Sequence, residues 1–226
     1  RIGAVPLSEL PPLWGAVLKV SLSPFGLTYS STITLLLMNR FLLIYGNEQS
    51  VAIYSCISYI TAIIYLLLQG VGDGCQPLIS LYYGEGKDAD VRQTRRTAYF
   101  TAFVISAVCA AVVFLTRTKI GLLFGASASA NAGVGTYLPF FLATVLLLSF
   151  VRITTSYFYA TEKAALSYLL VYAEPVCTLV FLLTLPLALK LNGVWMAIPA
   201  AQVCAFVIAL IAKCRSSNNI QKSLDI

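Results

Sequence analysis

Six strongly apolar stretches run along the chain, and short polar segments separate them. Their approximate bounds are 25–44, 51–83, 97–115, 134–153, 164–189 and 194–212. Each contains an apolar run near the ~20 residues with which a helix crosses a bilayer. In the second stretch this run ends near residue 68, and a more polar helical segment follows it. The pattern predicts an all-α integral membrane protein, a six-transmembrane-helix bundle whose membrane lobe covers residues 25–214.

The composition supports a membrane protein. Hydrophobic residues make up 59% of the chain, charged residues 11%, and the mean hydropathy is +0.85. A soluble domain is instead about 45–50% apolar and about 25% charged. The net charge of +6 comes from basic residues near the ends of the stretches. We therefore expect the lipid bilayer as a partner and no nucleic acid.

Several kinds of chemistry are excluded by the residues that the chain lacks. It has no histidine, and its six cysteines form no C-x-x-C pair. A Ser-His-Asp triad and a His-based metal site are therefore excluded. We expect no enzymatic activity, no metal site and no cofactor, apart from H⁺ or Na⁺ as a coupling ion.

The distribution of Lys and Arg predicts the orientation in the membrane. One side receives Arg1, Lys19, Lys87, Arg92, Arg95, Arg96, Lys163, Lys213, Arg215 and Lys222, and the other only Arg117, Lys119 and Lys190. Cytoplasmic loops carry the excess of positive charge. We therefore expect a multi-pass protein of the cell (plasma) membrane with both termini of this segment in the cytoplasm.

The two ends of the chain lie outside the predicted lobe. Residues 1–24 are expected to form a cytoplasmic or interfacial approach to the first helix, in which Trp14 is an interface anchor. Residues 215–226 are expected to form a cytoplasmic tail. The chain begins with Arg rather than Met, as expected of a fragment or a processed piece.

Ionisable residues inside the stretches are the strongest indication of function, because a charge in a membrane helix needs a partner, water or a cavity. They are Arg40, Asp73, Arg152 and Glu174. With a helical rise of ~1.5 Å per residue, Asp73, Arg152 and Glu174 lie about 16, 12 and 15 Å from the cytoplasmic ends of their helices. We therefore expect these three residues at a similar depth, and Arg40 to snorkel toward the opposite surface.

Asp73 lies on a polar face of the second stretch. Gln69, Asp73, Gln76 and Ser80 follow helical spacing, and Thr28, Thr32 and Asn39 place polar groups on the first helix. Polar faces on several helices favour an internal cavity, although single Ser and Thr side chains also form ordinary interhelical hydrogen bonds.

Glycines and prolines accompany the acids. Gly70 and Gly74 have the small-xxx-small spacing that allows close helix packing. Pro77 and Pro175 each remove a backbone hydrogen bond close to an acid, as in the broken helices of transporters. Asn192 and Gly193 are residue types that favour a helix C-cap, here at the end of the fifth helix.

The second stretch and several shorter segments resemble the C-terminal half of a multidrug and toxic compound extrusion (MATE) transporter. Residues 69–86 read QGVGDGCQPLISLYYGEG, similar to the glycine-rich stretch of that family with its QP-hydrophobic-S…YG ending. Shorter matches follow in order along the chain: Asn39 with Tyr45 and Gly46, then residues 121–124, 156–160 and 192–195.

The resemblance implies a twelve-helix protein of two six-helix lobes, of which this chain is the second, so that an N-terminal six-helix lobe is missing. It also implies a cation-coupled antiporter that exports amphipathic, often cationic, drugs by alternating access. Many relatives carry an acid in the helix that corresponds to residues 25–44, whereas this chain has no acid there and offers Thr28, Thr32 and Asn39 as polar groups. Asp73 and Glu174 are thus inferred from this sequence and not from the family.

The expected mechanism uses these two acids. One or both exchange H⁺ or Na⁺ with a small amphipathic substrate, and Arg152 pairs with the carboxylate left unoccupied. Gln69, Gln76 and Asn39 are the further substrate- or ion-coupling candidates, and tyrosines such as Tyr54, Tyr59 and Tyr65 offer rings to a cation. The alternative is a lipid or lipid-linked-oligosaccharide flippase of the same wider superfamily, which needs several cationic residues in its cavity.

Overall fold

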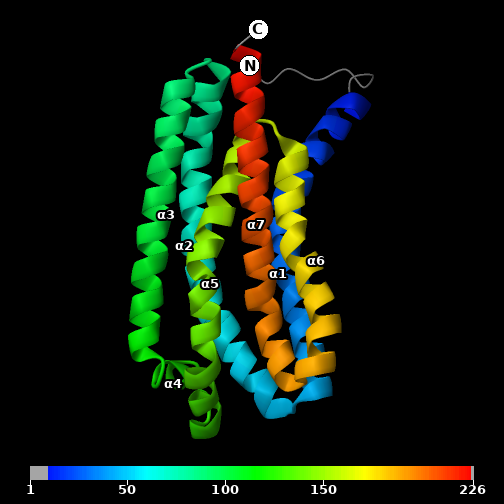
Figure 1. The fold of residues 1–226 in the computed structure, drawn as a ribbon, viewed down its shortest axis with the longest axis vertical. Coiled ribbons are helices and arrows are strands. Elements are labelled where there is room, and N and C mark those ends of the chain that lie inside the picture. Colours follow the sequence, from blue (N-terminus) through cyan, green and yellow to red (C-terminus); the bar gives the residue numbers. More distant parts are fainter. Residues whose placement is uncertain (1–9, 225–226) are drawn as a thin grey trace.

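The computed structural model describes residues 10–224, and its elements are all helices over that range. Seven helices follow one another: α1 Leu10–Tyr45, α2 Glu48–Gly84, α3 Asp88–Thr116, α4 Ile120–Leu123, α5 Ala128–Ala160, α6 Ala164–Leu189 and α7 Leu191–Leu224 (Figure 1). Six of them are long, and α4 is a single turn between α3 and α5.

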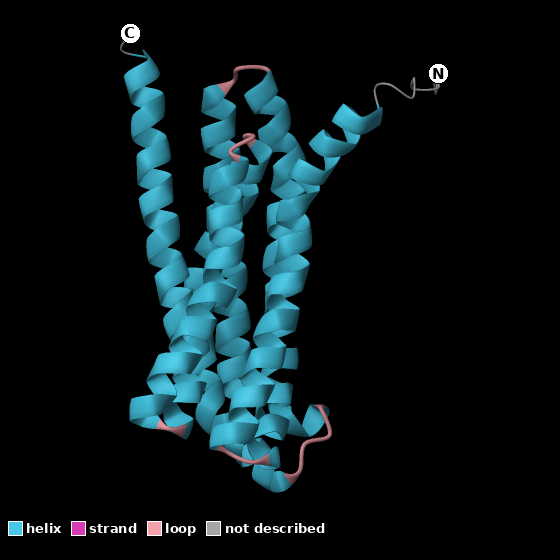
Figure 2. Cartoon of the chain, turned by 90° about the vertical axis from the view of Figure 1, so that its right-hand side faces the viewer, coloured by secondary structure: helices cyan, strands magenta, loops and turns pink. Residues whose placement is uncertain are grey.

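The long helices run side by side along the longest axis of the molecule (Figures 1 and 2). The α2–α3 and α5–α6 connections lie at one end, and the α1–α2, α3–α5 and α6–α7 connections lie at the other. The described start of α1 and the described end of α7 lie at the same end. Six long helices, an even number, thus place the two described ends on one side.

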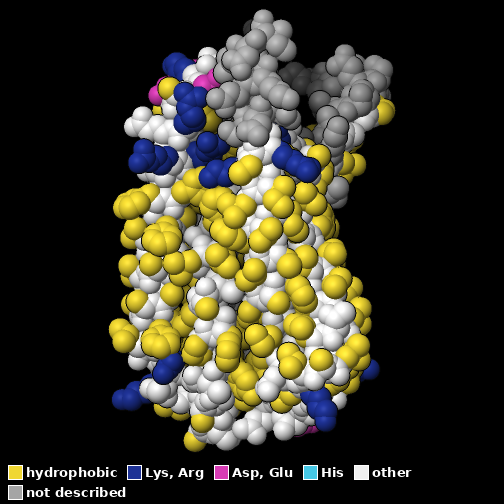
Figure 3. All heavy atoms as spheres, in the orientation of Figure 1, with side chains coloured by type: hydrophobic (Ala, Val, Ile, Leu, Met, Phe, Trp, Pro, Cys, Tyr) yellow, Lys and Arg dark blue, Asp and Glu magenta, His cyan; other side chains and the backbone are white. Residues whose placement is uncertain are grey.

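The outer surface is that of a membrane protein. Figure 3 shows a broad hydrophobic band, with Lys and Arg side chains gathered at the two ends of the molecule. Five described helices are long and apolar enough to cross a membrane, and α1 adds the shorter apolar stretch Ser31–Tyr45. The predicted six-transmembrane-helix bundle is thereby confirmed.

Most helices are longer than the predicted apolar spans. α1 is continuous from Leu10, so the described part of the expected approach segment is helical, while residues 1–9 lie outside the described range. Likewise α3 begins at Asp88 and α7 continues to Leu224, whereas residues 225–226 of the expected tail are not described. Hydropathy predicts only the part of a helix that lies in the hydrocarbon region. The helix itself continues into the polar residues on either side, because they extend the same backbone hydrogen bonding.

Close packing of α2 against α5 and of α6 against α7 builds the interior. A Cβ atom at position 72 would lie 2.5 Å from Oγ of Ser156, so α2 and α5 approach each other closely at Gly72. The expectation that Gly70 and Gly74 provide the packing surface is wrong for this lobe, because no heavy atom lies within 4 Å of a Cβ built at either position. The glycine between them, on another side of α2, makes the contact.

The turn between α6 and α7 also differs from expectation. α6 ends at Leu189, its C-cap is Lys190 with a φ of 51°, and Gly193 already belongs to the first turn of α7. The predicted cap at Asn192 and Gly193 is therefore wrong. Gly193 serves a different purpose, because a Cβ there would lie 2.5 Å from the carbonyl oxygen of Leu185.

We predict that Gly72→Ala destabilises the protein, because the added methyl group overpacks the contact with Ser156. Overpacking costs about 1–3 kcal/mol in general, and the lower end applies here because the Ser156 hydroxyl can turn away from the added methyl group. Thermal unfolding in detergent measures the effect. Gly74→Ala is the matched control, since its methyl group meets no neighbouring atom. Equal melting temperatures for the two variants would show that the α2–α5 contact is not tight.

Candidate functional site

A buried ion pair joins α5 to α6. Nη2 of Arg152 lies 3.8 Å from Oε2 of Glu174, and the two side chains are 9% and 18% exposed. The two residues come from helices that follow one another in the chain and run in opposite directions. Arg152 and Glu174 therefore neutralise each other within the lobe, as charges in a low-dielectric interior must.

Tyr65 of α2 completes this group from the other side. Cζ of Arg152 lies 3.7 Å from the centroid of the Tyr65 ring, close enough for a cation–π interaction. Nε of Arg152 and the hydroxyl of Tyr65 are buried without a hydrogen-bond partner. The arginine is thus held between a carboxylate and a ring, with hydrogen-bonding capacity left over.

Glu174 and Tyr65 open onto a cavity of about 490 Å³ in which α1, α2, α5, α6 and α7 all take part. Its lining is mainly apolar and aromatic, and it also includes hydroxyl and amide groups. These polar residues are Ser31, Thr32 and Thr34 of α1, Ser58, Thr61 and Gln69 of α2, and Gln202 of α7. Glu174 is the charged residue among the described lining residues, and Arg152 lies behind it.

Aromatic side chains form one wall of this cavity. Tyr54 and Phe141 line it, and both rings contact Trp195 of α7 edge-on, at 6.4 and 6.5 Å between centroids. The Tyr137 ring stacks on Trp195, with 4.2 Å between the ring centroids. Between α5 and α7, the hydroxyl of Thr144 donates to Oε1 of Gln202, which lines the cavity. The wall therefore offers ring surfaces to a ligand.

The structure separates Asp73 from the ion pair. Asp73 is exposed, and among the described residues no basic side chain lies within salt-bridge distance of it. It lies eight residues beyond Tyr65 on α2, or about 12 Å further along the helix. Gln69 lies between them and lines the cavity. Asp73 therefore continues the cavity-lining face of α2 beyond the cavity itself.

The remaining predicted residues occupy intermediate positions. Gln76 is half-buried, nearly one turn beyond Asp73. Asn39 is half-buried on α1, and its Oδ1 is buried without a hydrogen-bond partner. The side chain of Thr28 lies outside the described part of the structure. α2 and α6 continue through Pro77 and Pro175, so neither proline ends its helix.

Gln202, Thr144 and Trp195 belong to this site, although the sequence reasoning did not single them out. Gln202 could have been predicted as a site residue from the sequence, because it is an amide within an apolar span, like Gln69. Trp195 could not have been predicted in this way, since a tryptophan near the end of a membrane helix ordinarily indicates an interface anchor. It is instead 2% exposed.

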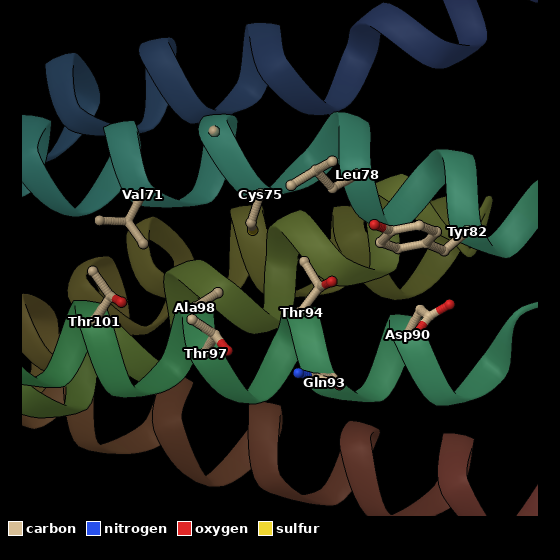
Figure 4. A pocket seen from close by; sticks show the side chains of 11 residues that line it. Val71, Cys75, Leu78, Tyr82, Asp90, Gln93, Thr94, Thr97, Ala98 and Thr101 are labelled. Carbon is tan, nitrogen blue, oxygen red and sulfur yellow. The ribbon is translucent and has the colours of Figure 1, made fainter.

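A second hollow of about 450 Å³ lies between α2 and α3 (Figure 4). Gly74 and Cys75 border it from α2, and Thr94, Thr97 and Thr101 from α3. The Sγ of Cys75 contacts the carbonyl oxygen of Gly72 at 3.2 Å. The glycine-rich segment thus serves two surfaces: Gly72 packs against α5, while Gly74 leaves space beside α3.

Comparison with known proteins identifies the family. The model of the MatE family matches residues 24–187, which include all the residues of the ion pair and most of the cavity. The chain belongs to the MatE family. The resemblance inferred from residues 69–86 is confirmed.

Two curated MatE relatives are named multidrug export protein MepA. That of Staphylococcus saprophyticus is 27% identical over 197 residues, which cover 86% of this chain and 43% of the relative. That of Staphylococcus haemolyticus is 25% identical over 196 residues, with the same shares. The chain therefore spans less than half the length of these relatives.

Solved structures share the fold. A multidrug resistance MATE family transporter in an outward-facing conformation superposes with a TM-score of 0.84 at 21% identity, over 96% of this chain and 49% of that one. A MATE in a bent conformation gives 0.84 at 20% identity, over 99% and 49%. A transporter from Pyrococcus furiosus, whose structure is described as having a binding pocket of reverse polarity, gives 0.82 at 21% identity, over 95% and 48%. This MatE chain has the fold of one transporter lobe.

We predict that the ion pair shows strong non-additivity in a double-mutant cycle. Glu174→Gln or Arg152→Gln alone leaves one charge without its countercharge. The cost is about 3–5 kcal/mol for a fully buried pair and lower here, because Glu174 reaches the cavity and Arg152 keeps its contact with the Tyr65 ring. The double variant removes both charges and should recover much of this loss. Unfolding in detergent measures all four proteins. Additive single and double effects would mean that the two side chains do not interact.

Proposed function

We propose that this chain is one lobe of a cation-coupled antiporter that exports amphipathic, cationic compounds by alternating access. The missing N-terminal lobe corresponds to the part of the curated relatives that this chain does not cover. The coupling ion is H⁺ or Na⁺. The protein would lie in the plasma membrane with both ends of this lobe in the cytoplasm. The names of the MepA relatives support drug export.

Glu174 carries the proposal, because its carboxylate is paired with Arg152 on one side and reaches the cavity on the other. A proton or Na⁺ that enters the cavity would compete with Arg152 for this carboxylate. A cationic substrate would compete for it as well, because one carboxylate neutralises one positive charge. Competition of ion and substrate for one group is the basis of exchange.

The release of Glu174 would not leave Arg152 without contacts. Its guanidinium remains over the Tyr65 ring, which stabilises a desolvated cation by about 2 kcal/mol or more. The nearby Tyr65 hydroxyl is free to bond to water or to substrate. The arrangement thus permits two states of Glu174 without moving the arginine into the cavity.

The cavity fits the proposed substrate class. Drug-sized ligands occupy pockets of about 300–1,000 Å³ that are mostly apolar with few polar groups. This cavity has about 490 Å³, the rings of Tyr54 and Phe141, and one carboxylate. A flat cation gains ring contacts and a countercharge there, whereas an anion would meet Glu174.

The flippase alternative finds no support in the described lining. Anionic lipids or lipid-linked sugars require several Lys or Arg side chains, but the described lining includes none, and Arg152 behind it is paired with Glu174. Asp73 has a different place in the proposal. It lies exposed beyond the cavity on the Gln69 face, where the missing N-terminal lobe would close the substrate path.

We expect Glu174→Gln to reduce substrate-driven ion exchange at least about tenfold, the effect of losing ~1.4 kcal/mol of interaction. Glu174→Asp, which keeps the carboxylate, should retain part of it. Asp73→Asn should affect transport less if Glu174 is the main exchange group. The measurement uses liposomes that contain the protein at its native length, with a pH or Na⁺ gradient and a fluorescent cation.

Thermal unfolding of each variant separates transport defects from misfolding. A folded Glu174→Gln protein that transports like the wild type would contradict the role of Glu174. Wild-type transport in both Glu174→Gln and Asp73→Asn would contradict the whole proposal. A dependence on the pH gradient alone, or on the Na⁺ gradient alone, identifies the ion.

A further inference from the structure

Three basic side chains from distant parts of the chain meet at one end of the lobe. They are Arg95 of α3, Lys163 in the α5–α6 connection and Lys213 of α7. Cζ of Arg95 lies 4.5 Å from the ring centroid of Tyr157, and Nζ of Lys163 lies 5.9 Å from the same centroid. Two of the three cations therefore share one aromatic ring.

Lys213 joins this group across α5. Its Nζ lies 4.3 Å from the ring centroid of Tyr99 on α3 and 4.7 Å from that of Phe150 on α5. The Tyr99 and Phe150 rings stack at 5.1 Å, and the Tyr99 hydroxyl is 2.8 Å from Oγ1 of Thr154. The three cations thus contact neighbouring rings of α3 and α5, and Lys213 brings α7 to these rings.

These cations have no countercharge among the described residues. The ion pairs in the described range are Lys87 with Glu85 and Arg152 with Glu174. Nζ of Lys163 instead contacts Oγ of Ser216 at 2.7 Å. Partial burial, and next the positive charge of Arg95, hold the pKa of Lys163 below its usual value. The three positive charges repel one another, and a bound anion would neutralise this repulsion.

We propose that Arg95, Lys163 and Lys213 bind the phosphate of an anionic phospholipid. Arg95 supplies a planar donor pair that suits phosphate oxygens, and the two lysines supply point charges. Basic clusters between membrane helices at the cytoplasmic surface are the typical sites for such headgroups. The site lies apart from the cavity, and it does not depend on the transport proposal.

The surroundings favour a lipid over a soluble phosphate. Phe103 lies one turn from Tyr99 on α3, and Leu210 lies about one turn from Lys213 on α7. Both lie toward the membrane centre, and both are exposed, at 51% and 37%. Figure 3 shows Lys and Arg side chains gathered at this end above the hydrophobic band. A phospholipid can contact the basic side chains with its headgroup and the exposed apolar side chains with its acyl chains. Free phosphate can contact only the basic side chains.

The test is lipid binding to the purified protein at its native length, measured by native mass spectrometry with phosphatidylglycerol. Each basic side chain near an anionic surface is worth about 1 kcal/mol, or about fivefold in affinity. We expect Lys213→Gln and Arg95→Gln each to weaken binding about fivefold. Lys213→Arg keeps the charge and should bind like the wild type.

Arg96→Gln is the matched control for Arg95→Gln. It removes the same side-chain type from the adjacent, exposed position, which projects about 100° away around the helix. An equal loss of affinity in Arg96→Gln would overturn the proposal, because general attraction to basic charge would then explain the binding. Wild-type affinity in both Lys213→Gln and Arg95→Gln would overturn it as well.

Two further ligands identify the source of the phosphate. Phosphatidylcholine, whose headgroup is neutral overall, should bind more weakly than phosphatidylglycerol and should not respond to Lys213→Gln. Inorganic phosphate at millimolar concentration should not displace phosphatidylglycerol. Displacement by phosphate at such concentrations would assign the site to a soluble anion and contradict a lipid ligand.

Discussion

The buried pair of Arg152 and Glu174 is the constraint on which the organisation of this lobe depends. A membrane interior offers no water to a charge, so each ion must find its partners within the protein. The pair draws together α5 and α6, and the Tyr65 ring adds α2. Once these helices are fixed, the cavity follows, because Glu174 and Tyr65 both border it.

Close packing makes this arrangement possible. Lipid does not drive helices together as water does, so membrane helices associate through small residues, hydrogen bonds and close contacts. Gly72 brings α2 against α5 near Ser156, one turn from Arg152. Gly133 makes a second close contact with Ile53, near the other end of the same two helices. The α2–α5 pair is thus held at two levels, and the arginine lies between them.

Much of the fold followed from hydropathy, because lipid imposes a simple rule on helix length and composition. The depth of a residue in the membrane could also be predicted for two of the charged residues. Arg152 and Glu174 were expected within a few ångströms of each other in depth, and they form an ion pair. The counted depth was less accurate for Asp73. It continues the Gln69 face but lies about 12 Å further along α2 than Tyr65, the α2 residue that contacts Arg152. Rotation about the helix axis could not be predicted either, and for that reason Gly72, and not Gly70 or Gly74, meets α5.

The hairpin of α6 and α7 has a mechanical consequence. The backbone of Gly193 lies against that of Leu185 and Pro186, and Lys190 closes the turn with a positive φ. Two helices in backbone contact beside so short a turn cannot slide past each other without breaking that contact. They therefore form a single lever. Glu174 on one arm and Gln202 on the other face the same cavity, so a tilt of this lever would carry both polar groups together while their spacing stays constant.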